Sequence, residues 1–164
     1  MRLVSRIVAF TGVISALTVA LSVLTMPFLL GSRIHFFQSG IMLAGVVGGP
    51  LSGLITGLIG GLYVATVRAD PTIIIGNGLL GLFTGILSLR LRPVLAGSIA
   101  WVFVQAPWVY VTGTFIFRVP AMAMQVILIM LTVEAIICAC IVDVLVNHFR
   151  LRGLLANQMR SIHV

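Results

Sequence analysis

Polar and aromatic residues that could bind a small molecule gather near the ends of long apolar runs. Amide, imidazole, indole and phenol groups at such positions can hydrogen-bond a ligand or stack on a flat one. These candidate ligand-binding residues are His35, Phe37, Gln38, Tyr63, Asn77, Gln105, Trp108, Tyr110, Gln125 and Glu134. An amide that faces lipid is costly, so we expect the four amides to hydrogen-bond either between helices or to a ligand.

Several of these side chains also have an ordinary membrane explanation. Trp101, Trp108 and Tyr110 could be rings of the interfacial belt, and Arg68 could extend its guanidinium to the headgroups. A charged acid at the bilayer centre costs about 2.5–3.5 kcal/mol on insertion scales, so Glu134 should face other helices or be protonated. It could act there as an interhelical hydrogen-bond partner or as a ligand contact.

No constellation of catalytic or metal-binding residues is visible. His35, His148 and His163 have no second ligand at helical spacing, and the chain contains no Lys for a phosphate-binding loop. Cys138 and Cys140 lie in an apolar run, where we expect both to be small buried residues. The sequence therefore predicts a chain that is not an enzyme and holds no metal or cofactor.

The composition excludes an ordinary soluble domain. Hydrophobic residues make up 60% of the 164 residues and charged residues 8%, with a mean hydropathy of +1.25. A soluble domain carries roughly 25% charged residues. The net charge of +7 comes from arginines scattered between apolar runs, which favours membrane topology over nucleic-acid binding. The chain is therefore predicted to be an integral membrane protein whose surroundings are a lipid bilayer.

Prolines divide the chain into helices. Proline is tolerated at the first position of a helix, and Pro50, Pro71, Pro93 and Pro120 stand at expected starts, while Pro27 closes the first run. Asp70 suits an N-cap. A single all-α membrane domain over 1–164 is predicted, with a short basic tail at 150–164. Its expected helices are 4–26, 36–48, 50–67, 71–89, 93–116 and 120–147.

The stretch 39–67 leaves the number of spans open. It could form one tilted helix or two short ones broken at Gly48, Gly49 and Pro50. Six spans with a cytoplasmic N-terminus put seven arginines inside and three outside, whereas five spans put four inside and six outside. The positive-inside rule thus predicts a six-transmembrane-helix bundle with both termini cytoplasmic. The first run is about as long as a spanning helix and lacks a clear cleavage site, so we expect a retained helix rather than a signal peptide.

Small residues recur every four positions in three of the helices. Gly53, Gly57 and Gly61, after Gly49, and then Gly81 with Gly85, predict close packing between the third and fourth helices. Gly12, Ala16 and Ala20 form a smooth face on the first helix, which could pack internally or dock on another membrane protein. Within the fifth helix, Pro107 cannot donate to the carbonyl of Phe103, which predicts irregular backbone near Trp108.

This layout resembles the substrate-binding S components of energy-coupling factor (ECF) transporters. Ala16 and Ala20 resemble their Ala-x-x-x-Ala motif, and the run 44–53, with Gly-Pro-x-x-Gly at its end, looks like the turn that many of them carry between helices two and three. The start of the fourth helix, from Asn77 to Gly81, is similar as well. The likeness in layout covers nearly the whole chain, through short motifs.

The resemblance implies a specific function. S components bind a vitamin or related micronutrient near the outer face of a prokaryotic cytoplasmic membrane, in a pocket lined by helices four to six and closed by the loop after helix one. They deliver it by toppling while docked on a transmembrane coupling protein that two ATPases drive. The docking motif carries over to Ala16 and Ala20, extended by Gly12. For the pocket the resemblance gives only regions, and the residues of this chain in those regions are 35–38, Asn77, Trp108, Tyr110 and Gln125.

The departures from that family bear on the substrate. The chain has too few pocket Trp, Glu and His residues for the thiamine branch and no early His for the nickel and cobalt branch. A flat, aromatic or partly apolar ligand with few charges would suit it better. Two rivals share the layout: the small membrane protein of the rod-shape complex and the membrane part of LytS-like sensor kinases. The second normally continues into a cytoplasmic signalling domain, for which the tail is too short.

Overall fold

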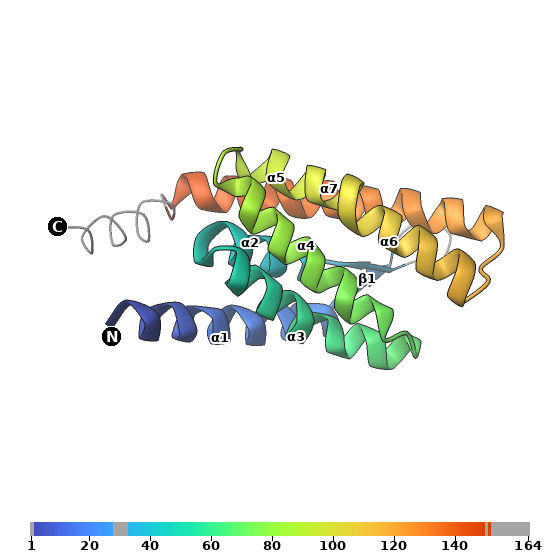
Figure 1. The fold of residues 1–164 in the computed structure, drawn as a ribbon, viewed down its shortest axis with the longest axis horizontal. Helices are drawn as coiled ribbons and strands as arrows, with labels where there is room; N and C mark the ends of the chain where they lie inside the picture. The colour runs from blue at the N-terminus through green and yellow to red at the C-terminus, as the bar shows by residue number, and fades with distance from the viewer. Residues whose placement is uncertain (1, 28–32, 150, 152–164) are drawn as a thin grey trace.

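The chain folds into a bundle of apolar helices with one short β-hairpin, as seen in a computed structural model that describes residues 2–27, 33–149 and 151 (Figure 1). The first part comprises helix α1 (Arg2–Val23), strands β1 (Thr25–Pro27) and β2 (Arg33–His35), and helices α2 (Phe37–Gly48), α3 (Pro50–Arg68) and α4 (Thr72–Ser88). The second part comprises α5 (Pro93–Ala100), η2 (Trp101–Gln105), α6 (Ala106–Val111), η3 (Thr112–Ile116) and α7 (Ala121–His148). The predicted all-α class is confirmed.

The prolines start the helices as predicted. Pro50 and Pro93 occupy the first positions of α3 and α5, while Pro71 and Pro120 stand directly before the first residues of α4 and α7. The Asp70 carboxylate accepts a hydrogen bond from the backbone N–H of Thr72 at 2.9 Å. It therefore satisfies one of the N–H groups that a helix start leaves without a partner.

The stretch 39–67 forms two helices rather than one. Gly49, between α2 and α3, has a φ of 87°, a conformation that glycine adopts readily, and Pro50 supplies no N–H to continue α2. The resulting short helix α2 contributes Ile41 to one buried apolar cluster and Met42 to another. Helix α2 contacts α1, α3, α4, α5 and α7, and eight of its twelve residues are buried, so it forms the centre of the bundle.

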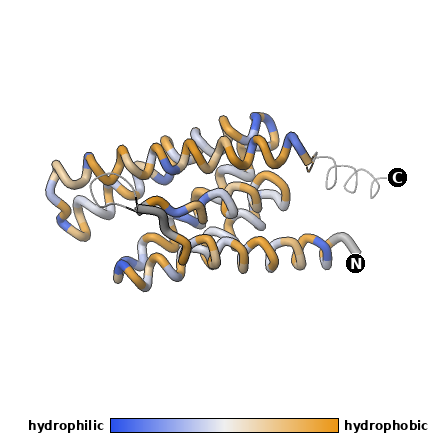
Figure 2. The backbone as a smooth tube through the Cα atoms, turned by 180° about the vertical axis from the view of Figure 1, so that it is seen from behind, coloured by the Kyte–Doolittle hydropathy of each residue, from blue (hydrophilic) through white to orange (hydrophobic). Residues whose placement is uncertain are grey.

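The helix lengths are compatible with a membrane protein. Among the described residues, four helical segments are long and apolar enough to cross a bilayer: Val4–Val23, Pro50–Arg68, Pro93–Ile116 and Ala121–His148. Helix α2, with 12 residues, and α4, with 17, are shorter. Figure 2 shows apolar residues along the helices and many of the hydrophilic ones near the ends of the bundle.

The glycines of α3 and α4 pack the two helices backbone to backbone, as predicted. A Cβ atom added to Gly57 would lie 2.1 Å from the carbonyl oxygen of Asn77, and one added to Gly53 would lie 2.3 Å from that of Gly81. Any side chain at these two positions would push the helices apart.

The smooth face of α1 does not pack inside the bundle. Gly12, Ala16 and Ala20 are exposed, and a Cβ atom at Gly12 would meet nothing within 4 Å. The buried face of α1 is instead a stripe of hydroxyl residues, Thr11, Ser15, Thr18 and Ser22. Their spacing of four, three and four residues marks one helix face, which the sequence contained and the prediction overlooked.

The first helix ends earlier than predicted. It stops at Val23 rather than at 26, and β1 pairs antiparallel with β2 in the register Thr25 to His35 and Pro27 to Arg33. A proline disfavours the helical conformation for the residue before it, which here is Met26, so a helix that continues to Pro27 is unfavourable. The predicted basic tail at 150–164 lies outside the described residues, apart from Leu151.

A candidate ligand-binding cavity

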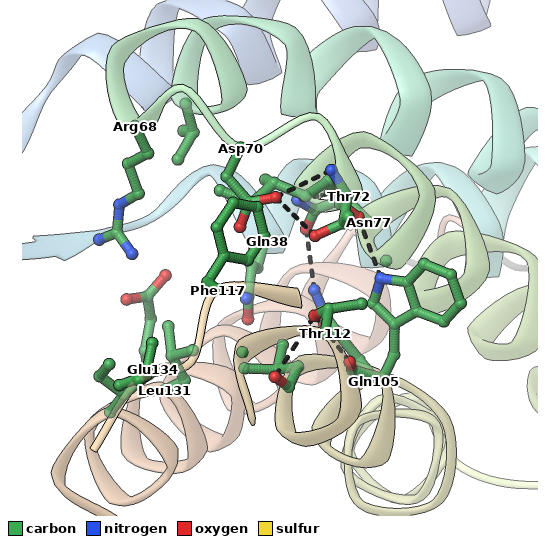
Figure 3. Close-up of a pocket in the computed structure, with 18 of the residues that line it drawn as sticks. Gln38, Arg68, Asp70, Thr72, Asn77, Gln105, Thr112, Phe117, Leu131 and Glu134 are labelled. Carbon is green, nitrogen blue, oxygen red and sulfur yellow. Dashed lines mark hydrogen bonds between the residues drawn. The ribbon is translucent and has the colours of Figure 1, made fainter. Parts of the chain in front are cut away.

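A cavity of about 270 Å³ opens where α3 turns into α4, at the end of the bundle opposite the first residues of α1 (Figures 1 and 3). It is bounded by β2, by the N-terminal ends of α2 and α4, by the segment from η2 to η3, and by the first half of α7. Small-molecule sites typically measure about 300–1,000 Å³, so this cavity suits a small ligand.

The cavity collects seven of the ten candidate residues. His35, Phe37, Gln38, Asn77, Gln105, Trp108 and Glu134 line it. The other three candidates are not among the lining residues: Tyr63 is 39% exposed, Tyr110 is 49% exposed, and Gln125 is exposed as well. The region that the family resemblance assigned to the pocket therefore includes two residues, Tyr110 and Gln125, that face outward.

A chain of side-chain hydrogen bonds joins η2 to α4 beside the cavity. Gln105 donates from Nε2 to Asn77 Oδ1 at 3.1 Å, and Asn77 donates from Nδ2 to the backbone carbonyl of Ile73 at 2.9 Å. Trp108 donates from its indole nitrogen to the carbonyl of Thr72 at 3.0 Å. Asn77 and Gln105 thus make the interhelical contact expected of amides in an apolar bundle, and the indole of Trp108 bonds to α4.

The irregular backbone predicted around Pro107 takes the form of two π-helical segments. The N–H of Ala106 bonds to the carbonyl of Trp101, and the N–H of Phe117 bonds to that of Thr112, each five residues back. A π turn holds more residues than an α turn, so it changes which side chains face inward, and such turns are frequent at functional sites. Gln105 ends η2 and Thr112 begins η3, and both side chains are buried against the cavity.

Glu134 reaches the cavity from the middle of α7. The side chain is 3% exposed, and its Oε1 atom has no hydrogen-bond partner in the described part of the chain. The guanidinium of Arg68 and the backbone N–H of His35 face the carboxylate. Figure 3 shows Arg68 and Glu134 directed toward each other across one side of the cavity. The predicted inward orientation of Glu134 is therefore confirmed.

Two further buried acceptors in the cavity wall lack a protein partner. Gln38 Oε1 and Gln105 Oε1 have no hydrogen bond in the described structure, although both side chains are almost fully buried. An unsatisfied buried polar group costs about 1–3 kcal/mol, so most such groups in proteins are bonded. All of these acceptors belong to residues that line one cavity.

The candidate set omitted part of the cavity lining. The omitted polar residues are Arg68, Asp70, Thr72 and Thr112, and the omitted apolar ones include Phe117, Met124, Ile127 and Leu131. One helical signal was available in α7. Met124, Ile127, Leu131 and Glu134 are three, four and three residues apart, which places them on one face, and Gln125 lies off that face.

Among the residues that the structure describes, no group of three His, Cys, Asp or Glu residues could hold a metal ion. Cys138 is buried as predicted, but the prediction for Cys140 is wrong, because Cys140 lies on an exposed face of α7.

Comparison with known proteins finds no match for the chain among protein-family models, curated proteins or solved structures.

Proposed function

We propose that this chain is the substrate-binding subunit of an ECF-type importer, which captures a vitamin-like small molecule in the cavity and passes it on through partner proteins. The observation that carries the proposal is the set of three buried, unpartnered acceptors, Gln38 Oε1, Gln105 Oε1 and Glu134 Oε1, in one cavity. A ligand that donates to them offsets the cost of their burial.

The proposed orientation has both termini in the cytoplasm of a prokaryotic cell and all six helical segments within the membrane. Arg6, Arg90 and Arg92 lie toward the end of the bundle that holds the start of α1, whereas Arg68 lies at the cavity. Under the positive-inside rule the cavity then opens to the outside, where an importer meets its substrate.

The proposed docking surface is the exposed α1 face of Gly12, Ala16 and Ala20. In lipid, small residues let a partner helix approach closely, and α1 already uses its opposite face for the bundle. The partner would be a transmembrane coupling protein. ATP hydrolysis would take place on a pair of ATPases, so that the chain itself is not an enzyme and needs no cofactor.

Binding is tested by identifying the molecule that the protein retains. The chain is purified in mild detergent and denatured, and the released molecules are analysed by mass spectrometry. Equilibrium titration with a panel of vitamins follows. We expect one retained small molecule and at least one tight ligand, and uniformly millimolar affinities would contradict the proposal.

Docking is tested on α1 by co-purification of the coupling protein and the ATPases. Ala16→Trp with Ala20→Trp should abolish co-purification and leave ligand binding intact, because both positions are exposed and neither lines the cavity. Val4→Trp is the matched control, since Val4 is also exposed but lies about 120° around the helix from Ala16 and about 160° from Ala20. Unchanged complex formation in the double variant would show that the docking assignment is wrong. A chain that holds partners but no small molecule would instead fit the rod-complex scaffold.

A further inference from the structure

The hydrogen-bond chain beside the cavity determines which atom Gln105 presents to a ligand. The oxygen and nitrogen of an amide are ordinarily interchangeable in a structure. Here the carbonyl of Ile73 can only accept, so Asn77 must turn its Nδ2 toward it and its Oδ1 toward Gln105. Asn77 Oδ1 can likewise only accept, so Gln105 presents Nε2 to it and leaves Oε1 without a partner among the described residues. Gln105 is therefore a fixed acceptor.

Glu134 provides a second acceptor, and it comes from a different helix. Figure 3 shows Gln105 beside Asn77 and Glu134 beside Arg68, on separate sides of the cavity. Because Glu134 is 3% exposed, a group that donates to its Oε1 does so away from bulk water. A ligand that spans the cavity meets an acceptor at each end.

The positive charge of Arg68 does not make this end of the cavity favour a ligand carboxylate. Its side chain is exposed, so water screens its attraction for an anion, whereas the Glu134 carboxylate is buried. A group that donates to Glu134 Oε1 satisfies a buried acceptor, whereas a ligand carboxylate there would add a second acceptor beside it.

Apolar side chains form part of the cavity wall. They include Val64, Ile73, Phe117, Ile127 and Leu131, beside the polar residues Asp70, Thr72 and Thr112. Gln38 Oε1 is a third acceptor without a partner among the described residues. An apolar, preferably planar body fits against the apolar side chains.

We propose that the ligand has a small apolar body with a hydrogen-bond donor at each end: an N–H group for Gln105 and an amine, amidine or amide for Glu134, with no carboxylate at that second end. This inference rests on the proposed binding function and deepens it by naming the ligand's chemical class.

Three matched aromatic probes test each end separately. In 4-aminobenzamidine both ends donate, in 4-methylbenzamidine a methyl group replaces the amine, and in 4-aminobenzoate a carboxylate replaces the amidine. Dissociation constants are measured by titration calorimetry on the purified full chain after removal of any retained molecule. We expect 4-aminobenzamidine to bind at least about tenfold more tightly than either of the other two.

Two variants test whether Glu134 and Gln105 cause these differences in affinity between the probes. The affinity for 4-aminobenzamidine over that for 4-aminobenzoate is the amidine-over-carboxylate ratio, and the affinity for 4-aminobenzamidine over that for 4-methylbenzamidine is the amine-over-methyl ratio. Glu134→Gln should reduce the first ratio at least about tenfold and leave the second unchanged. Gln105→Leu should bring the second ratio to about one and leave the first unchanged. Gln125→Leu is the matched control, because Gln125 is exposed and does not line the cavity, and both ratios should persist in it. Ratios within one variant do not depend on how much of it is folded, and Gln105→Met serves where the leucine variant does not fold.

The outcomes separate the two proposals. Tighter binding of 4-aminobenzoate that is lost in Arg68→Gln would overturn the inference while leaving the binding function intact. The same holds for a retained molecule with a carboxylate and no donor. If the protein holds no molecule and binds none of the probes or vitamins, both proposals are wrong.

Discussion

The contact between α1 and α3 and the cavity use polar side chains in opposite ways. Across α1 and α3 the hydroxyl of Thr11 lies 2.7 Å from that of Ser52, and the hydroxyl of Ser15 lies 3.1 Å from that of Thr56. In the cavity Gln105 and Glu134 each keep an acceptor atom without a partner among the described residues. Both regions are buried among apolar helices. Paired hydroxyls thus join two helices, whereas the unpaired acceptors are the groups that the proposed ligand would satisfy.

The largest effect is expected from a methyl group between α3 and α4, because both regions depend on that contact. Gly57→Ala would place its Cβ atom 2.1 Å from the carbonyl oxygen of Asn77, and backbone cannot move aside cheaply. We expect a loss of about 1–3 kcal/mol of stability or more, measured by thermal unfolding in detergent.

Gly12→Ala is the matched control for that substitution. Its Cβ atom meets nothing within 4 Å, so the variant should be as stable as the original or slightly more stable, since alanine favours the helix by about 1 kcal/mol over glycine. Equal destabilisation by both variants would show that α3 and α4 do not pack through their glycines.

The second prediction concerns how the cavity fixes its acceptor. Asn77→Leu removes the group that orients Gln105, so Gln105 can turn its nitrogen toward the ligand. The preference of the protein for 4-aminobenzamidine over 4-methylbenzamidine should fall about tenfold, while the amidine-over-carboxylate ratio persists. A merely structural role of Asn77 would change both affinities alike and leave both ratios unchanged.

The third prediction measures the hydroxyl pairs between α1 and α3. A double-mutant cycle with Thr11→Val and Ser52→Ala should give a coupling of about 0.6 kcal/mol, the average of such measurements within a membrane bundle. Ligand affinity should not change, since neither residue lines the cavity. A shift in ligand affinity would contradict the division of the bundle into two regions.

The smallest effect is expected at Tyr63 and Tyr110, which the sequence predicted to bind the ligand but which do not line the cavity. Tyr63→Phe and Tyr110→Phe remove phenol groups that are exposed and absent from the cavity lining. Ligand affinity should change by less than about twofold, well under 1 kcal/mol. A larger loss in either variant would mean that the ligand extends beyond the cavity.

Local chemistry made the helices predictable. Pro50 and Pro93 begin helices because each lacks an N–H, and Gly49 ends α2 because it can take a positive φ. Such signals depend on the residue and its chain neighbours. The hydroxyl stripe of α1 and the α7 face that carries Glu134 were also readable from their spacing, but spacing does not say which of a helix's faces meets the bundle.

The amino-acid sequence by itself therefore determined the apolar all-α class, the limits of most helices and the close packing of α3 on α4. Only the tertiary structure decided which polar groups meet. Arg68 ends α3 and Glu134 lies in the middle of α7, yet both face one cavity, whereas Tyr110 turns outward from the same segment that brings Gln105 and Thr112 in. The reason is geometric, because the direction of a side chain depends on the rotation of its helix against its neighbours, and the two π turns change that rotation on either side of α6.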